Sequence, residues 1–251
     1  MMARRVAPET LDQLAPADPA AIRSRRDLLR VHRAMGTRAI LARGWQDLVS
    51  GGVARLPLRI LELGAGDGRL LLGVARELAP HWPCVHLTLL DQQDIVSPAT
   101  LAAYAALGWT VQVQRDDVLA WAARPDEARP DEGLLGAGLQ RWDLISTALF
   151  LHHFEGDPLD RLLAAVASRS DRFFAYEPRR SSMALLGSHL VGVLGANAVT
   201  REDAVLSVQA GFRGEEISAI WPRGTTSAWN TREFAAGMFS HCFSARRAGI
   251  E

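Results

Sequence analysis

The stretch that most restricts how this chain can fold lies at residues 61–70 and reads LELGAGDGRL. Gly64, Gly66 and Gly68 follow a short apolar run, and glycines there let a backbone turn sharply and approach a ligand closely. A helical pattern begins near Arg69, so the first N–H groups of that helix would face an anionic group held by the loop. The stretch therefore predicts a strand, a ligand-binding loop and a helix in direct succession.

Strand and helix patterns alternate from this unit to the end of the chain, and most of the strand segments are apolar. Such alternation predicts an α/β fold whose mostly parallel sheet is covered by helices on both faces, with ligands at the carboxyl ends of the strands. The predicted strands are 58–63, 85–90, 109–114, 144–148, 172–176, 215–221 and 238–246. The predicted helices are 70–78, 98–107, 159–168, 182–194 and 200–209, with one or two more within 21–50. Residues 1–20 are predicted to be a loose tail, and 124–141 a loop.

Charge and cysteine content narrow the choice of partners. The 28 basic and 28 acidic residues cancel, so a nucleic-acid or anionic membrane partner gains no electrostatic support. All the basic residues are Arg, which excludes a Schiff-base lysine. The two cysteines, Cys84 and Cys242, lie far apart, and no run of 18 apolar residues occurs. We therefore expect a cytoplasmic protein without a metal cluster, a membrane partner or a nucleic-acid partner.

An acidic residue after the second predicted strand separates two classes of cofactor. That strand ends in Asp91, whose carboxylate suits a ribose diol. A dinucleotide loop would need G-x-G-x-x-G, but the sixth position counted from Gly64 is Arg69. The spacing instead resembles E/D-x-G-x-G-x-G, the first motif of class I S-adenosylmethionine-dependent methyltransferases. Another Rossmann-type protein is the alternative.

Further positions match this family in order along residues 58–221. The segment QRDDVLAW resembles the family's G-D-hydrophobic segment, with Asp117 fitting best and Asp116 as its rival, and the fourth strand begins at Asp143. The resemblance implies a Rossmann-like three-layer sandwich with a seven-stranded, mostly parallel sheet, an antiparallel last strand and N-terminal lid helices. It implies an N-terminal tail and lid helices at residues 1–52 and an S-adenosylmethionine-binding methyltransferase domain at 53–251. The implied S-adenosylmethionine ligands are Glu62, Gly64, Ala65, Gly66, Gly68, Asp91, Gln92, Asp117, Val118 and Ala148.

Two adjacent histidines follow the fourth predicted strand, in LFLHHFE at 149–155. The segment resembles L-H-D-W of small-molecule O-methyltransferases that act on phenols, in which the histidine is the general base. The resemblance places that role on His152, with His153 where those enzymes have an acid. Glu177 stands where the family has the acid that orients the histidine, and a carboxylate there would fix the tautomer of His152. His152 as pocket wall or as a purely structural residue is the alternative.

The acceptor site is less well marked. Arg179 on the rim could bind an acceptor's carboxylate or phenolate, or could lie on the surface. Phe150 could line the pocket. The place of a second acid of the family falls near Asn197, which can hydrogen-bond but carries no charge. His32, Arg33 and Arg38 fall in the predicted lid helices, near the cofactor or acceptor.

These features predict a bacterial enzyme of secondary metabolism that methylates a small aromatic or polyketide-like hydroxyl, with His152 as general base and no metal. Methylation at carbon or nitrogen, with His152 only orienting the acceptor, is one alternative. A non-catalytic subunit that binds S-adenosylmethionine is another. The expected partner is a small-molecule acceptor, and the expected state is a monomer or a homodimer.

Overall fold

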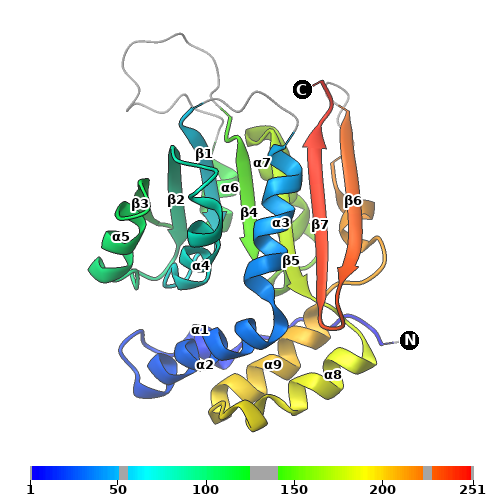
Figure 1. Ribbon diagram of the computed structural model, residues 1–251. Coiled ribbons are helices and arrows are strands. Elements are labelled where there is room, and N and C mark those ends of the chain that lie inside the picture. Colours follow the sequence, from blue (N-terminus) through cyan, green and yellow to red (C-terminus); the bar gives the residue numbers. More distant parts are fainter. Residues whose placement is uncertain (1, 51–55, 125–140, 223–227, 250–251) are drawn as a thin grey trace.

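The computed structural model describes residues 2–50, 56–124, 141–222 and 228–249. A seven-stranded sheet with the order β3-β2-β1-β4-β5-β7-β6 forms its centre (Figure 1). The strands are β1 (Leu58–Leu63), β2 (Val85–Asp91), β3 (Trp109–Arg115), β4 (Leu144–Ala148), β5 (Arg172–Pro178), β6 (Trp229–Ala236) and β7 (Ser240–Arg247). The first five strands pair in parallel, whereas β7 is antiparallel to both β5 and β6. The predicted mostly parallel sheet with an antiparallel last strand is confirmed.

Helices cover both faces of the sheet, because successive apolar residues of a buried strand point to opposite sides. On β1, Ile60 packs into one core cluster and Leu61 into the other. The first cluster includes residues of α3 (Thr37–Val49), α4 (Arg69–Leu78) and α5 (Pro98–Ala105). The second includes residues of α6 (Val118–Ala123), α7 (Asp157–Arg169) and α10 (Glu216–Ile220). Two cores on either side of one sheet make the predicted three-layer arrangement.

A further group of helices lies across the edge of the sheet at which β1, β4 and β5 end. Figure 1 shows them below the arrowheads of β4 and β5. They are α1 (Thr10–Gln13), α2 (Pro19–Met35), α8 (Ser182–His189), the 3₁₀ helix η2 (Val191–Leu194) and α9 (Ala198–Ala210). Gly36, with a φ of 68°, ends α2 and turns the chain into α3, so the predicted region 21–50 contains two helices.

The prediction of a loose tail at residues 1–20 is wrong. Arg4 donates to the carbonyls of Ala210 and Phe154, at 2.8 and 2.9 Å. The carboxylate of Asp203 in α9 accepts from the backbone N–H groups of Thr10 and Leu11. These hydrogen bonds join residues 150 to 206 positions apart, so local composition gave no sign of them.

The predicted strand at 215–221 is also wrong, because this segment forms α10. Ile217 and Trp221 are four residues apart and both are buried, which is a helical spacing. The carboxylate of Glu233 accepts from the N–H groups of Ile217 and Ser218 and so satisfies the first turn. The sixth strand is instead β6, which the sequence pattern missed because an edge strand without a buried residue has no continuous apolar run.

Other boundaries are closer to the prediction. The apolar segment 182–194 forms α8 and η2 in place of one continuous helix, and the last strand begins at Ser240. The predicted loop at 124–141 lies outside the described residues except at its two ends. The predicted division at residue 52 also lies outside them and stays a prediction.

Candidate active site

A cavity of about 740 Å³ opens between the carboxyl ends of the strands and the helices that lie across them. Its wall includes the glycine loop after β1, the segments that follow β2, β3 and β4, and residues of α2, α8, η2 and α9. The volume is within the usual range for pockets that bind small molecules and cofactors. Eleven of the predicted site residues line it: Gly64, Ala65, Gly66, Asp91, Gln92, Asp117, Val118, Ala148, Phe150, His152 and His153.

The three loop glycines all have a positive φ, which disfavours any side chain. At Gly64 an added Cβ would also lie 2.2 Å from the ring of Phe150, so both the backbone conformation and this contact exclude a side chain. At Gly66 an added Cβ would meet nothing within 4 Å, although the residue lines the cavity. The loop therefore leaves open space above Gly66, where a ligand could approach the backbone.

Asp91 is fixed in place by the loop itself. Its Oδ2 accepts from the N–H of Gly66 and its Oδ1 from the N–H of Gln93, both at 2.8 Å. Each oxygen keeps a further lone pair for a ligand hydroxyl. Asp117 accepts from two N–H groups at the start of α6 and caps that helix, while its rival Asp116 pairs with Arg124. Both lie in the cavity wall, so the geometry leaves the choice between them open.

Glu62 and Gly68 lie behind the loop, outside the cavity wall. Burial raises the pKa of Glu62 to about 8, although Ser146 and the backbone of Ala148 donate hydrogen bonds to it. Its Oε2 has no hydrogen-bond partner within the described structure. At neutral pH this carboxyl group is therefore mostly protonated, and a cationic ligand group beside it would favour the ionised form.

A buried carboxylate organises the segment after β4. Both oxygens of Glu177 accept hydrogen bonds, from the backbone N–H groups of Phe150, Leu151 and His152 and from Nδ1 of His152 at 2.8 Å. Leu149, immediately before them, has a φ of 58°, which is rare for a residue with a branched side chain. This turn forms η1 (Leu151–His153) and fixes the His152 ring. The predicted contact between His152 and Glu177 is observed.

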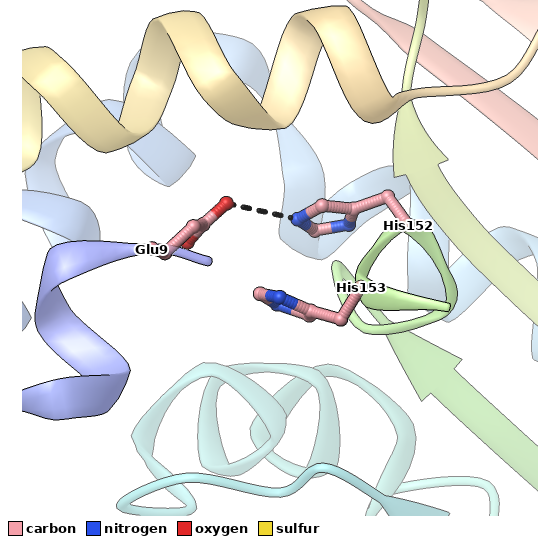
Figure 2. A group of neighbouring side chains, drawn as sticks. All are labelled: Glu9, His152 and His153. Carbon is pink, nitrogen blue, oxygen red and sulfur yellow. Dashed lines mark hydrogen bonds and ion pairs between the residues drawn. The ribbon is translucent and has the colours of Figure 1, made fainter. Parts of the chain in front are cut away.

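The opposite ring nitrogen of His152 is paired with a residue of the N-terminal segment. Figure 2 shows the carboxylate of Glu9 reaching Nε2 of His152, at 3.2 Å, with His153 beside them. Ser207 of α9 also donates to Glu9. Burial alone would lower the pKa of His152, but the hydrogen bonds to Glu177 and Glu9 outweigh it and raise the pKa to about 9. His152 is therefore an imidazolium at neutral pH, with a carboxylate on each side.

His153 differs from its neighbour in charge. Burial, and then the positive charge of His152, lower the pKa of His153 to about 4, so its ring is neutral. Asp12 lies 3.5 Å from its Nδ1, and burial, followed by repulsion from Glu9, raises the pKa of Asp12 to about 6. One donor atom each of Glu9, His152 and His153 lie within 4.8 Å of one another, a set that a divalent transition metal could accept. The proton shared by Nε2 of His152 and the carboxylate of Glu9 would have to leave before these atoms could bind such a cation.

Of the remaining predicted residues, His32 lines the cavity, whereas Arg179, Asn197 and Arg38 do not. The guanidinium of Arg179 donates to the carbonyl of Gly237 in the turn between β6 and β7. Asn197 is the N-cap of α9, and its amide nitrogen donates to the carbonyl of Ala20. Arg38, considered for the lid, forms an ion pair with Glu77 on α4, at 3.3 Å.

Sequence reasoning missed Glu9 and Asp12 of the N-terminal segment and Ser207 of α9. A single acid in a stretch rich in Pro and Ala has no periodicity to mark it. One signal in the sequence pointed to a missing acid. The resemblance implied a second acid beside the histidine, and Asn197 stood at its expected place. Glu9 provides a second carboxylate beside His152, from a different part of the chain.

No family sequence model matches the chain, and no curated protein is detectably similar to it in sequence. In three dimensions it resembles the plantazolicin methyltransferase BpumL in complex with SAH, with a TM-score of 0.54 and 13% identity over 92% of this chain and 91% of that one. It also resembles an O-methyltransferase family protein from Burkholderia thailandensis, with a TM-score of 0.55 and 16% identity over 93% of this chain. The chain covers 62% of that longer protein.

The chain therefore has the Rossmann-like fold of S-adenosylmethionine-dependent methyltransferases, as its ordered motifs predicted. At this level of identity the likeness establishes the fold, whereas the reaction depends on the residues that line the cavity. In the part of the chain that the structure describes, every helix is too short or too polar to span a bilayer.

Proposed function

We propose that the protein is a methyltransferase that uses S-adenosylmethionine to methylate a hydroxyl group of a small molecule. The observation that carries the proposal is one cavity whose wall joins a glycine loop and Asp91 to His152, which Glu177 holds in place. The glycine loop and Asp91 suit a nucleoside with a charged tail, and His152 with Glu177 suits an acceptor that must lose a proton.

The residues at the loop end fit this cofactor. Asp91 has lone pairs free for ribose hydroxyls, and the space above Gly66 would admit the chain of atoms that joins ribose and amino acid. The unpaired oxygen of Glu62 is suited to an ammonium group. When bound, the cofactor supplies a methyl group on a sulfonium, with a neutral thioether as leaving group.

His152 then handles the proton of the acceptor. Its Nε2, once it has lost its own proton, would take the hydroxyl proton of the acceptor where the cofactor would supply its methyl group to the acceptor oxygen. This role requires the acceptor to displace Glu9 from Nε2. The loss of that carboxylate lowers the pKa of His152, because burial then opposes the charge with one partner fewer. Glu177 keeps the ring oriented throughout.

The test is methyl transfer to a panel of phenols by the wild-type protein and by His152→Ala. We expect the variant to lose about 10²–10⁴ in turnover, with unchanged affinity for S-adenosylhomocysteine in calorimetry. His241→Ala is the matched control: His241 is equally buried and also paired with a carboxylate, Glu233, but is absent from the cavity wall. A wild-type protein that binds no cofactor would refute the proposal, and unchanged turnover in His152→Ala would remove the base role.

An amine acceptor is the second candidate, favoured by the two carboxylates of Glu9 and Asp12 beside the histidines. These acids would hold an ammonium group before it loses its proton. The NMR spectrum of the product, after reaction with an amino phenol, distinguishes the candidates by whether oxygen or nitrogen carries the methyl group.

A further inference from the structure

Large apolar side chains are exposed together on one segment at the mouth of the cavity. This segment, residues 183–194, comprises most of α8 and all of η2. Its exposed apolar residues are Met183, Leu186, Leu190, Val193 and Leu194, with exposed fractions of 56, 56, 55, 85 and 42%. Single exposed apolar residues are ordinary, but a group of them marks a surface that binds something.

The exposed segment continues into the cavity. Leu190, Val193 and Leu194 belong both to the exposed group and to the cavity wall. A hydrogen bond from Arg30 to the carbonyl of Gly195 joins the end of η2 to α2, at 3.1 Å. The residues of α2 that line the cavity include Leu28, Leu29, Val31 and Met35. Apolar residues of α2 and of the exposed segment therefore line the same cavity, and those of the exposed segment also face solvent.

Polar groups along the α2 wall do not change this character. His32 lines the cavity, and burial lowers its pKa to about 4, so its ring is neutral. Arg25 directs its guanidinium to the carbonyl of Pro16. The carboxylates of the site, Glu9 and Asp12, lie at the histidines. A ligand would meet hydrogen-bonding groups at His152 and mainly hydrocarbon beyond.

We propose that the acceptor is an amphiphile, with its hydroxylated head group at His152 and a hydrocarbon tail of several carbons that runs along α8 and η2 to the opening. The inference rests on the proposed function, since it names the acceptor class of the same site. A tail in this position covers Leu190, Val193 and Leu194, which line the cavity and otherwise face water. Each added methylene then strengthens binding until the tail passes the opening.

The test measures binding of a series of 4-alkylphenols, from methyl to octyl, to the protein with S-adenosylhomocysteine present. We expect Kd to fall about fourfold for each added methylene and then to level off. In the double variant Leu190→Asp/Val193→Asp the affinity for 4-methylphenol should stay the same, while the gain with chain length is lost. Both residues are exposed, so folding is not at risk. Ile220→Asp, exposed on α10 and outside the cavity wall, is the control and should behave as wild type.

A Kd independent of chain length in the wild type, or the same gain in the double variant, would overturn the inference. So would a double variant that keeps the gain but loses binding to phosphatidylcholine vesicles, because the exposed segment would then be a membrane-docking surface. This test measures binding and not methyl transfer. A protein that shows the chain-length effect but methylates no phenol would therefore refute the proposed function and leave the inference about the acceptor standing.

Discussion

The glycine-loop end of the cavity is built from short stretches that directly follow β1, β2 and β3, whereas the acceptor end is assembled from distant segments. At the first end, Asp91 binds the N–H of Gly66, 25 residues away in a neighbouring β–loop–α unit. At the second, Glu9 and Ser207 are 198 residues apart, and both contact the group around His152. A binding site for a common cofactor can be read from local motifs, while the acceptor site depends on how remote segments pack.

The difference also appears in charge. At the acceptor end the buried imidazolium of His152 lies between two carboxylates, and its charge depends on both. At the loop end Asp91 is held by backbone N–H groups, whose dipoles no substitution of a side chain can remove. We therefore expect side-chain substitutions to disturb the acceptor end more than the loop end.

The largest effect is expected at Glu177. Its replacement by Ala removes the acceptor for three backbone N–H groups and leaves His152 without its fixed partner. Breaking such a buried pair costs about 3–5 kcal/mol in the free energy of unfolding, measurable by urea denaturation. Methyl transfer should be lost in parallel.

Glu233→Ala is the matched control for Glu177→Ala. The Glu233 carboxylate also accepts from two backbone N–H groups and from a buried histidine, His241, but away from the cavity. We expect a comparable loss of stability with turnover per folded molecule retained. Equal loss of turnover in both variants would mean that Glu177 acts only through stability.

The sequence allowed the fold and the loop end to be predicted, but only half of the acceptor end. Gly66 and Asp91 sit in ordered motifs whose spacing is set by the β–loop–α unit, and the pairing of His152 with Glu177 follows from the neighbouring ends of β4 and β5. Glu9 could not be predicted, because its position depends on α9, which carries no motif that marks an N-terminal partner. The roles of these residues in catalysis stay predictions.

The second effect concerns pH. The folded pKa of His152, about 9, exceeds its ordinary value of 6.5, so its pairing stabilises the fold fully below pH 6.5, and that contribution is lost as pH rises through 9. The lost stability is roughly 3 kcal/mol. Facing His152 are Glu177 of β5, Glu9 and Asp12 of the N-terminal segment, and neutral His153.

Glu62 also makes the fold less stable as pH rises, because its folded pKa of about 8 exceeds its ordinary value of 4.5. The variant Glu9→Gln separates the contribution of His152 from that of Glu62. The variant weakens one of the two ion pairs of His152, so its fall in stability from pH 6.5 to 9 should be smaller by on the order of 1 kcal/mol. Chemical denaturation at a series of pH values measures this. Glu155→Gln removes an exposed charge nearby and should keep the wild-type pH profile. An unchanged profile in Glu9→Gln would show that Glu9 contributes little to the charge of His152.

A modest effect is expected at the loop end, for Gly66→Ala. The residue has a φ of 55°, where a side chain costs about 1–2 kcal/mol, but an added Cβ meets no protein atom within 4 Å. The methyl group would point into the open space that the cofactor is proposed to fill, so the Kd for S-adenosylhomocysteine should rise about tenfold. Gly214→Ala isolates backbone strain, because Gly214 has a φ of 59° and an equally open surrounding outside the cavity wall. It should lose similar stability and bind the cofactor as wild type does. Equal affinity in both variants would place the cofactor away from Gly66 and remove the distinction between a loop end and an acceptor end.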